Sequence, residues 1–253
     1  MTPYVDVQSL TKSFGAHILF NNISFSIAEG QHVGLIAKNG TGKTTLLSIL
    51  AGKESYESGS IIYKKDLRIG FLEQAPQFDP NESVLDACFN HNGEPEMVLK
   101  AKQILTQLKI SDLEQHMGQL SGGQQKRVAL ANILITEPDM LILDEPTNHL
   151  DLDMIEWLEG YLSRGNKTLL MVTHDRYFLD RVCNIILELD DKTMYTYRGN
   201  FKYYMEKRQE RIDTTRAEIE RANNLYRREL EWMRRMPQAR GHKARYREEA
   251  FYD

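Results

Sequence analysis

The segment Gly34–Thr45 constrains the fold more than any other part of the sequence, because a glycine-rich turn stands between a short apolar run and an amphipathic run. Gly40 and Gly42 allow the backbone to curl so that its N–H groups surround a phosphate, and Lys43 adds a positive charge. A loop of this kind follows a strand and opens a helix. The segment therefore predicts an α/β fold with a nucleotide phosphate site.

One position departs from the usual pattern of such loops, in which glycine stands six residues before the lysine. Here that position is Ala37, and Gly34 lies three residues too early to replace it. An alanine is tolerated at this point if its φ is negative and is strained if its φ is positive. A plain glycine-rich turn is the alternative interpretation, which the preceding strand and the pair Lys43 and Thr44 disfavour.

A second polar feature lies about a hundred residues later, where the apolar run Met140–Leu143 ends in Asp144 and Glu145. Burying a carboxylate is costly unless a cation balances it. We expect Asp144 to hold Mg²⁺, with the Thr44 hydroxyl as a further ligand, and Glu145 to orient or deprotonate an attacking water. A surface turn is the alternative, and the phosphate loop upstream favours the metal site.

Elsewhere, short apolar runs alternate with helical patterns, which predicts a mostly parallel sheet covered by helices. Strands are predicted at Val5–Leu10, Ile23–Ile27, His32–Ile36, Ile61–Tyr63, Arg68–Phe71, Met140–Leu143, Thr168–Val172 and Ile185–Leu189. Helices are predicted at Lys43–Ala51, Gly122–Leu134, Leu152–Ser163 and Arg176–Val182. Because the first strands follow one another without helices, we expect an antiparallel layer at the front edge. Residues 79–119 are interpreted as a helical insertion, with helices at Ser83–Asn90 and Glu96–Leu108.

Composition narrows the class of protein. The chain has 253 residues, of which 27% are charged and 41% hydrophobic, as in soluble globular proteins. No apolar run approaches the length of about 18 residues that a membrane span requires. The start of the sequence lacks the features of a secretion signal, and Cys88 and Cys183 are too few for a disulfide scaffold. We therefore expect a cytoplasmic protein without a membrane partner.

Charge is distributed unevenly along the chain. Residues 1–199 hold 18 Lys and Arg against 26 Asp and Glu, whereas residues 200–253 hold 14 against 10. From Phe201 onward apolar residues recur at helical spacing, with Arg221, Arg228 and Arg235 on the opposite side, and Pro237 and Gly241 are expected to end the helix. The pattern predicts a long basic helix that could contact a polyanion, although a solvated helix of mixed charge is the alternative.

The run Leu120–Arg127 begins Leu-Ser-Gly-Gly-Gln and resembles the signature motif of ATP-binding cassette (ABC) ATPases. The resemblance implies a P-loop NTPase fold of the ABC ATPase type, with a mixed sheet, an antiparallel β layer and a helical subdomain. It also implies that the signature of one cassette covers the ATP held by the phosphate loop of a second cassette. A helix that starts at Ser121 provides an anion site, which agrees with this implication.

The remaining motifs of the family fall in the expected order. Phe14 matches the aromatic residue that stacks on adenine, Gln74 the glutamine near Mg²⁺ and the attacking water, Asp151 the D-loop aspartate, and His174 the switch histidine. By resemblance, the catalytic residues are Glu145, His174 and Gln74, and the metal ligands are Thr44, Gln74 and Asp144. The residues implied to bind ATP are Phe14, Asn39, Gly40, Thr41, Gly42, Lys43, Thr44, Thr45, Ser121, Gly122, Gly123, Gln124 and Asp151.

Two strings, Asp144–Asp151 and Thr173–Asp180, look like the forms found in ABC-F proteins, which carry two cassettes in one chain and act on ribosomes. The segments after Tyr197 and around Trp232 are similar to the Uup branch. The resemblance implies an ABC ATPase domain over residues 1–199, with a helical subdomain over about 79–138. It further implies a basic linker over 200–253 that precedes a second cassette and contacts rRNA and tRNA.

Two alternatives share the ATP-binding residues. The chain could be the ATPase subunit of a membrane ABC transporter, although such a subunit does not need an arginine-rich helix after its cassette. It could also be an ATPase that acts on branched DNA, because a basic helix fits DNA as well as RNA.

Overall fold

The computed structural model describes residues 3–89, 95–164 and 167–234. It divides into two compact units, Met1–Tyr204 and Met205–Asp253. The domain boundaries expected from the sequence, at residue 199 and for a helical subdomain over about 79–138, stay predictions.

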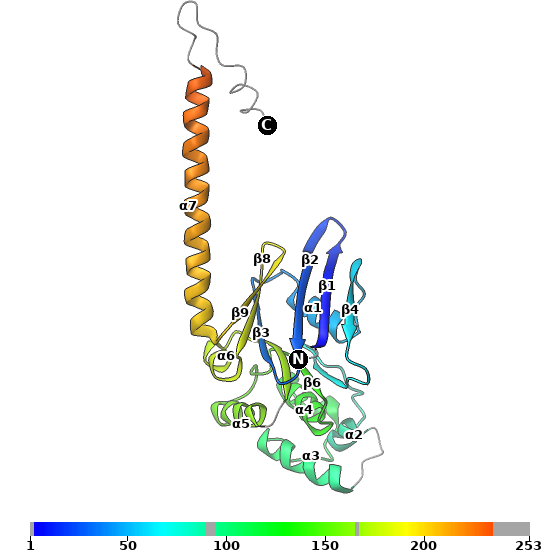
Figure 1. Cartoon of the computed structure of the whole chain (residues 1–253). Coiled ribbons are helices and arrows are strands. Elements are labelled where there is room, and N and C mark those ends of the chain that lie inside the picture. The colour runs from blue at the N-terminus through cyan, green and yellow to red at the C-terminus, as the bar shows by residue number, and fades with distance from the viewer. Residues whose placement is uncertain (1–2, 90–94, 165–166, 235–253) are drawn as a thin grey trace, which may run out of the picture. The chain divides into compact units, whose positions relative to one another are not determined.

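A six-stranded sheet forms the centre of the first unit (Figure 1), with the strand order β5-β6-β7-β3-β8-β9. Its strands are β3 (His32–Ala37), β5 (Ile69–Leu72), β6 (Met140–Asp144), β7 (Thr168–Val172), β8 (Ile185–Asp190) and β9 (Thr193–Arg198). All pairings are parallel except the last, between β8 and β9. Because parallel strands end at one edge of a sheet, the residues that follow β3, β5, β6 and β7 are brought together.

A separate three-stranded sheet has the order β2-β1-β4 and confirms the expected antiparallel layer. It consists of β1 (Pro3–Phe14), β2 (His17–Ala28) and β4 (Ser58–Tyr63). β1 and β2 are longer than predicted, because polar residues such as Lys12 and Asn21 continue the strands beyond their apolar parts. Phe14 and His17 pair where β1 and β2 meet, so both lie at the same end of the hairpin.

Strand β9 was not predicted. It pairs with β8 over six residues, from Ile185 with Arg198 to Asp190 with Thr193. The turn between them places Asp191 and Lys192 at positive φ without using a glycine. The sequence therefore lacks the usual signal of a tight hairpin at this point.

Helices surround the mixed sheet. They are α1 (Lys43–Leu50), α2 (Val84–Phe89), α3 (Pro95–Gln107), α4 (Gly122–Ile135), α5 (Leu152–Ser163) and α6 (Arg176–Val182), with a 3-10 helix η1 (Met117–Gln119). Both α2 and α3 pack on α4, and both lie in the segment where the sequence predicts helices. The mixed sheet, the antiparallel layer and these helices agree with the fold class expected from the sequence.

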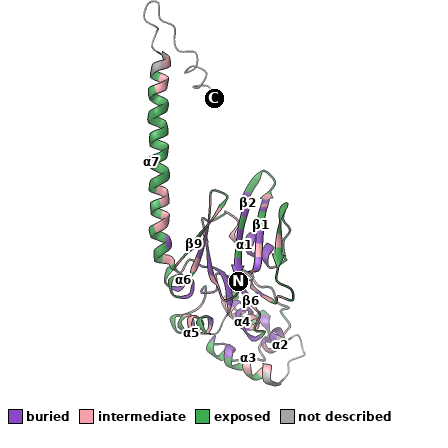
Figure 2. Cartoon of the chain, viewed as in Figure 1, coloured by how far each residue is buried: buried purple, intermediate pink, exposed green. Residues whose placement is uncertain are grey.

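Two hydrophobic cores lie on opposite sides of the mixed sheet, and β6 contributes to both. Leu141 and Leu143 belong to the core shared with α2–α6, whereas Met140 and Ile142 belong to the core shared with α1 and the antiparallel sheet. This division follows from the alternation of side chains along a strand. Figure 2 shows the buried residues concentrated in the strands and on the inner faces of the helices. β6, the strand that ends in Asp144, is therefore packed on both of its faces.

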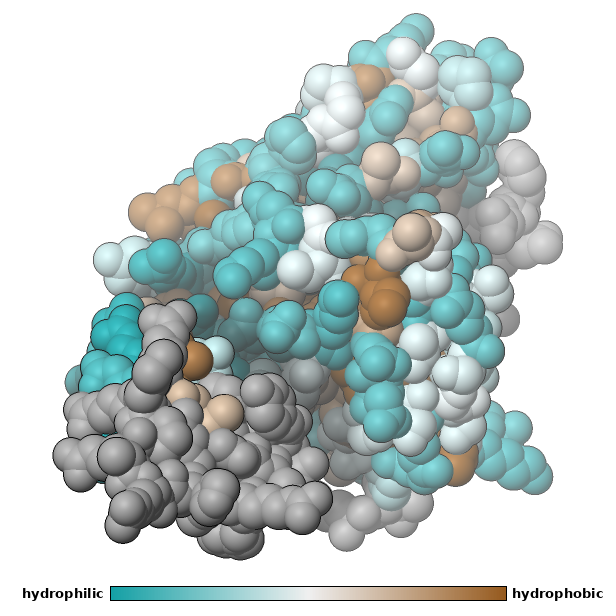
Figure 3. Space-filling model, turned by 90° about the horizontal axis from the view of Figure 1, so that it is seen from above, coloured by the Kyte–Doolittle hydropathy of each residue, from teal (hydrophilic) through white to brown (hydrophobic). Residues whose placement is uncertain are grey.

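The surface turned to the viewer in Figure 3 is mostly hydrophilic, and its hydrophobic residues form small, separate patches. Within the described ranges, no helix has both the length and the apolar composition to cross a membrane.

The helix α7 (Phe201–Arg234) has 34 residues, which corresponds to about 50 Å. Its first turn belongs to the first unit, where Tyr204 is buried and packs edge to face on Tyr197. In the second unit, the apolar residues Ile219, Leu225 and Tyr226 are about half exposed. The expected helix end at Pro237 and Gly241 lies outside the described residues.

Candidate functional site

The phosphate loop connects β3 to α1 through residues 38–42. Gly40 and Gly42 have φ angles of 80° and 94°, in the region that favours glycine. Thr41 points back into the loop, since its hydroxyl donates a hydrogen bond of 2.7 Å to the backbone oxygen of Lys38. The two glycines thus produce the turn that the sequence predicts, and Thr41 stabilises it.

Lys43 is the first residue of α1, and its ammonium group closes the loop. The Nζ atom donates to the backbone oxygens of Ala37 at 2.9 Å and Lys38 at 3.1 Å. Partial burial lowers the pKa of Lys43, although the nearby Glu145 and Asp144 oppose the shift. The Lys43 ammonium group therefore lies at the phosphate loop, close enough to Asp144 and Glu145 to interact with both carboxylates.

Ala37 is the last residue of β3, where its φ is not positive. The alanine is therefore unstrained in this loop, and the positive φ angles fall on Gly40 and Gly42 instead. The departure from the usual pattern leaves the turn intact.

Asp144 ends β6 and is 2% exposed. Burial raises the pKa of its carboxyl group, although a hydrogen bond with Thr44 and the nearby Lys126 and Lys43 oppose the shift. Its Oδ2 atom is buried and has no hydrogen-bond partner. An unpaired buried carboxylate oxygen is costly, so this atom is suited to a cation.

Glu145 follows directly and has a different environment. Its backbone has a φ of 51°, which is unusual for a residue with a side chain. Its N–H group donates to Val172 at 2.8 Å. Its carboxylate accepts from the backbone N–H of His174 at 3.2 Å and lies 3.3 Å from the Nε2 atom of that residue. The strained backbone and the two contacts fix the direction of the carboxylate.

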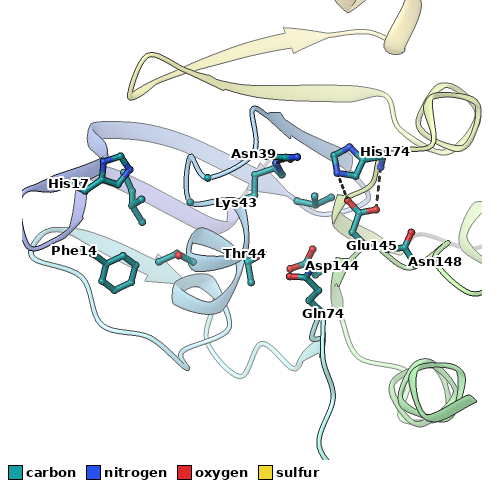
Figure 4. A pocket seen from close by; sticks show the side chains of 15 residues that line it. Phe14, His17, Asn39, Lys43, Thr44, Gln74, Asp144, Glu145, Asn148 and His174 are labelled. Carbon is teal, nitrogen blue, oxygen red and sulfur yellow. Dashed lines mark hydrogen bonds and ion pairs between the residues drawn. The ribbon is translucent and has the colours of Figure 1, made fainter. Parts of the chain in front are cut away.

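One pocket of about 630 Å³ contains most of the predicted site residues. Figure 4 shows Phe14 at one end, Gln74, Asp144, Glu145 and His174 at the other, and Lys43 and Thr44 between them. The predicted residues that line it are Phe14, Asn39, Gly40, Gly42, Lys43, Thr44, Thr45, Gln74, Asp144, Glu145 and His174. Its size is typical of a pocket for a small molecule.

Four lining residues were missed by the sequence analysis, namely His17, Leu19, Asn148 and Val172. His17 and Leu19 reach the pocket because β2 pairs with β1 beside Phe14. Only the register of that hairpin could have revealed them. Asn148 lies three residues beyond Glu145, within the Asp144–Asp151 string, and could have been found there.

The signature residues Ser121, Gly122, Gly123 and Gln124 do not line this pocket. Ser121 caps α4, because its Oγ atom accepts from the N–H of Gln124 at 3.3 Å and its own N–H donates to the Gln124 side chain at 2.9 Å. This capping box leaves the first amides of an exposed helix start available to another partner.

Asp151 also lies outside the pocket lining. Its carboxylate caps α5 by accepting from the N–H of Met154 at 3.1 Å and forms an ion pair with Lys109. In this structure Asp151 thus serves the start of a helix, and its predicted role at the nucleotide stays a prediction.

Comparison with known proteins decides the family. The profile described as "ABC transporter" matches residues 20–148, about half of the chain, and a second profile with the same description matches residues 187–252. The chain belongs to the ABC transporter ATP-binding cassette family.

Relatives of the cassette are found among bacterial proteins. It is 40% identical to an "Uncharacterized ABC transporter ATP-binding protein YfmR" of Bacillus subtilis, over 95% of this chain and 44% of that protein. It is 33% identical to the "Energy-dependent translational throttle protein EttA" of Escherichia coli K12, over 91% of this chain and 49% of that protein. The chain thus spans less than half the length of these relatives.

A solved structure described as the ATP-binding subunit of an ABC transporter has a TM-score of 0.70 and 19% sequence identity, and covers 78% of this chain and 90% of its own. This likeness supports the fold of the cassette. ABC ATPase domains bind and hydrolyse ATP, so the pocket around Lys43 is the candidate site for that chemistry.

Proposed function

We propose that this cassette binds ATP together with Mg²⁺ and hydrolyses it as part of an ABC-F protein of Uup type, which acts on ribosomes and tRNA. The grouping of Lys43, Thr44, Asp144 and Glu145 in one pocket is the observation that carries the proposal. We assign nucleotide binding to the loop residues Asn39–Thr45, with Phe14 stacking on adenine at the far end.

The unpaired Oδ2 atom of Asp144 fits a metal ion, because it is a buried oxygen ligand that lacks a donor. Thr44, Asp144 and Gln74 would hold Mg²⁺, which on binding neutralises charge on the phosphate oxygens. Thr44 lies close enough to Asp144 to lower the pKa of its carboxyl group, so two of the three ligands are already neighbours.

Glu145 acts on the attacking water. The water oxygen forms a bond to the γ-phosphorus, the bond from that phosphorus to the bridging oxygen breaks, and the water proton passes towards the Glu145 carboxylate, giving ADP and phosphate. His174 contacts both oxygens of that carboxylate, which supports the assignment.

A second cassette completes the site. Ser121–Gln124 line no part of the pocket of their own chain, and the exposed start of α4 can bind an anion. We infer that these residues cover ATP held by another cassette, in the same protein or in a second copy. Asp151 would then contact that partner.

The ribosomal role is supported by two observations. The relative EttA is named a translational throttle protein. The segment from Arg216 to Arg247 holds ten basic against four acidic residues, which favours contact with RNA phosphates. The described part of this segment is helical.

The experiment uses the protein that contains this cassette and compares Glu145→Gln with the control Glu159→Gln. Glu159 is partly buried, forms an ion pair with Arg181 and lies outside the pocket lining. Loss of a general base lowers turnover by about a hundredfold or more, so we expect that loss for Glu145→Gln, with ATP affinity within about threefold of wild type. Glu159→Gln should behave as wild type. Unchanged turnover in Glu145→Gln would refute the assigned role.

The same variants test the target. Glu145→Gln should cosediment with ribosomes in ATP more strongly than wild type, because the ATP-bound state persists. Stronger binding to branched DNA at equal salt would favour the DNA-processing alternative and contradict the ribosomal one.

A second candidate function is energy supply to a membrane transporter. The name of the Bacillus subtilis relative, an ABC transporter ATP-binding protein, favours it. Copurification with membrane proteins, without ribosomes, would support this candidate against the first.

A further inference from the structure

Lys126 is a buried cation that the proposed chemistry does not use. It is the fifth residue of α4 and is only 5% exposed. Burial lowers its pKa, although Asp144 and Glu145 lie near enough to oppose the shift. A buried ammonium group is costly, and an apolar side chain of similar size is often no worse for stability. Stability alone therefore does not explain a lysine at this position.

The hydrogen bonds of the Lys126 ammonium group are to backbone oxygens. Its Nζ atom donates to the backbone oxygen of Asp144 at 3.1 Å and lies 3.4 Å from the backbone oxygen of Gln74. One ammonium group thus joins the end of β6 to the loop that follows β5. Figure 4 shows the side chains of Gln74 and Asp144 at the same end of the pocket.

The sheet itself does not fix these two backbone positions relative to each other. β5 and β6 pair from Ile69 with Met140 to Leu72 with Leu143, and the pairing ends there. Gln74 lies two residues past the last pair and Asp144 one residue past it. Lys126 supplies a connection at the point where ladder hydrogen bonds stop.

We propose that Lys126 is a positioning residue for ATP hydrolysis, which clamps the Gln74 loop to the end of β6 and ties both to the helix that begins with the signature residues. This inference rests on the proposed function. A displacement of α4 when Ser121–Gln124 engage ATP would reach the backbone of Gln74 and of Asp144 through this side chain.

The test compares Lys126→Met, which keeps the volume and removes the charge, with Lys126→Arg, which keeps a donor. Lys100→Met is the matched control, because the Lys100 ammonium donates to Ile135 at the other end of α4, outside the site. Lys126→Met should lower kcat by about tenfold to a hundredfold, the cost of losing hydrogen bonds from a charged group. Its KM for ATP should stay within about threefold of wild type. Lys126→Arg and Lys100→Met should keep more than a third of wild-type kcat.

Hydrogen exchange without nucleotide tests the clamp itself and does not depend on turnover. In Lys126→Met, the backbone amide hydrogens of residues 73–78 and 144–148 should exchange at least about tenfold faster than in wild type. In Lys126→Arg and Lys100→Met, they should exchange at the wild-type rate. Equal exchange in wild type and Lys126→Met would overturn the clamp. Three results would overturn the positioning role. They are an unchanged kcat in Lys126→Met, an equal loss of kcat in Lys126→Arg, and a rise in the KM of Lys126→Met that accounts for the whole effect.

The two proposals can fail separately. A wild-type protein that neither binds nor hydrolyses ATP would contradict the proposed function, whatever the exchange of residues 73–78 shows. Faster exchange in Lys126→Met together with unchanged kcat would contradict only the role of Lys126 in hydrolysis.

Discussion

Asp144 and Glu145 are adjacent acids with different surroundings. Asp144 has a buried oxygen without a partner and a raised pKa. Glu145 has a strained backbone and a carboxylate held by His174. Two neighbouring carboxylates in unlike environments are suited to different roles, and here we assign one to the metal and one to the water.

The glycines of the phosphate loop give the first prediction. Gly42→Ala should destabilise the protein by about 2 kcal/mol or more, because a side chain at positive φ is strained and its Cβ atom would lie 2.9 Å from the Leu19 side chain. Gly40→Ala introduces the strain alone, since nothing lies within 4 Å of its Cβ. Urea unfolding measures both variants. Equal stability of Gly42→Ala and wild type would contradict the geometry of the loop.

Ala37→Gly restores the residue that the usual loop pattern contains. Because Ala37 is not at positive φ, glycine relieves no strain and should cost up to about 1 kcal/mol through the entropy of the unfolded chain. ATP affinity should stay within about twofold, as measured by titration calorimetry. A tenfold gain in affinity would show that the alanine distorts the loop.

Among the elements, β5 and β6 depend on one ion pair at their starts. Asp139 accepts from the Arg68 backbone N–H at 2.9 Å, and the Arg68 guanidinium binds the same carboxylate. These bonds lower the pKa of Asp139. The pair therefore helps to fix the register of β5 and β6, the strands that precede Gln74 and end in Asp144.

Asp139→Asn should lower the free energy of unfolding at pH 7 by about 1 kcal/mol, the upper range for a surface pair. Since the folded pKa lies below the unfolded value, this contribution is present above about pH 4 and is lost as pH falls through the folded pKa. Stability curves of the variant and wild type should then converge in acid. Asp191→Asn, at an exposed turn, is the control. A constant difference down to pH 2 would contradict this explanation.

Helices and strands with a clear hydrophobic period or a motif could be predicted from the sequence. Features that depend on which strands pair, and in which register, could not. Asp144 and Glu145 stand at the end of an apolar run, and Lys43 stands at the start of the helix that follows another such run. They meet in one pocket because parallel strands end at one edge of the sheet. β9 was missed because its turn uses Asp191 and Lys192, residues that rarely signal a hairpin. His17 reaches the pocket only through the register of β1 and β2.

Lys126 illustrates the same limit. In the sequence it is one basic residue among the polar residues of a helix start, typical of a solvated position. Its burial and its contacts with Gln74 and Asp144 depend on how α4 packs against β5 and β6. The signature residues were located correctly as a helix start, with Ser121 at the cap.

For the whole molecule, the division of charge is the feature most relevant to partners. Residues 1–199 carry an excess of acids and residues 200–253 an excess of bases. The net negative charge of residues 1–199 lowers affinity for polyanions, so contact with nucleic acid would depend on residues 200–253. Arg221 and Arg228 are exposed in α7.

Replacing Arg221 and Arg228 together with Gln should weaken binding to tRNA and lower the salt slope of log K by about 1.5, as expected for two lost phosphate contacts. Lys102→Gln with Arg164→Gln removes the same charge from exposed sites in the first unit and should leave the slope unchanged. Filter binding between 50 and 200 mM salt, roughly the range in which such slopes are measured, provides the readout. Equal slopes for all three proteins would contradict the role of α7.

The central claim is that this pocket holds a nucleotide and its metal ion. It is tested by titrating ATP into wild type and into Asp144→Asn, each with and without Mg²⁺. Wild type should bind ATP at least about tenfold more tightly when Mg²⁺ is present, a difference of about 1.4 kcal/mol, and Asp144→Asn should lose that difference. Equal affinity with and without Mg²⁺ in wild type, or the same dependence on Mg²⁺ in Asp144→Asn, would contradict it.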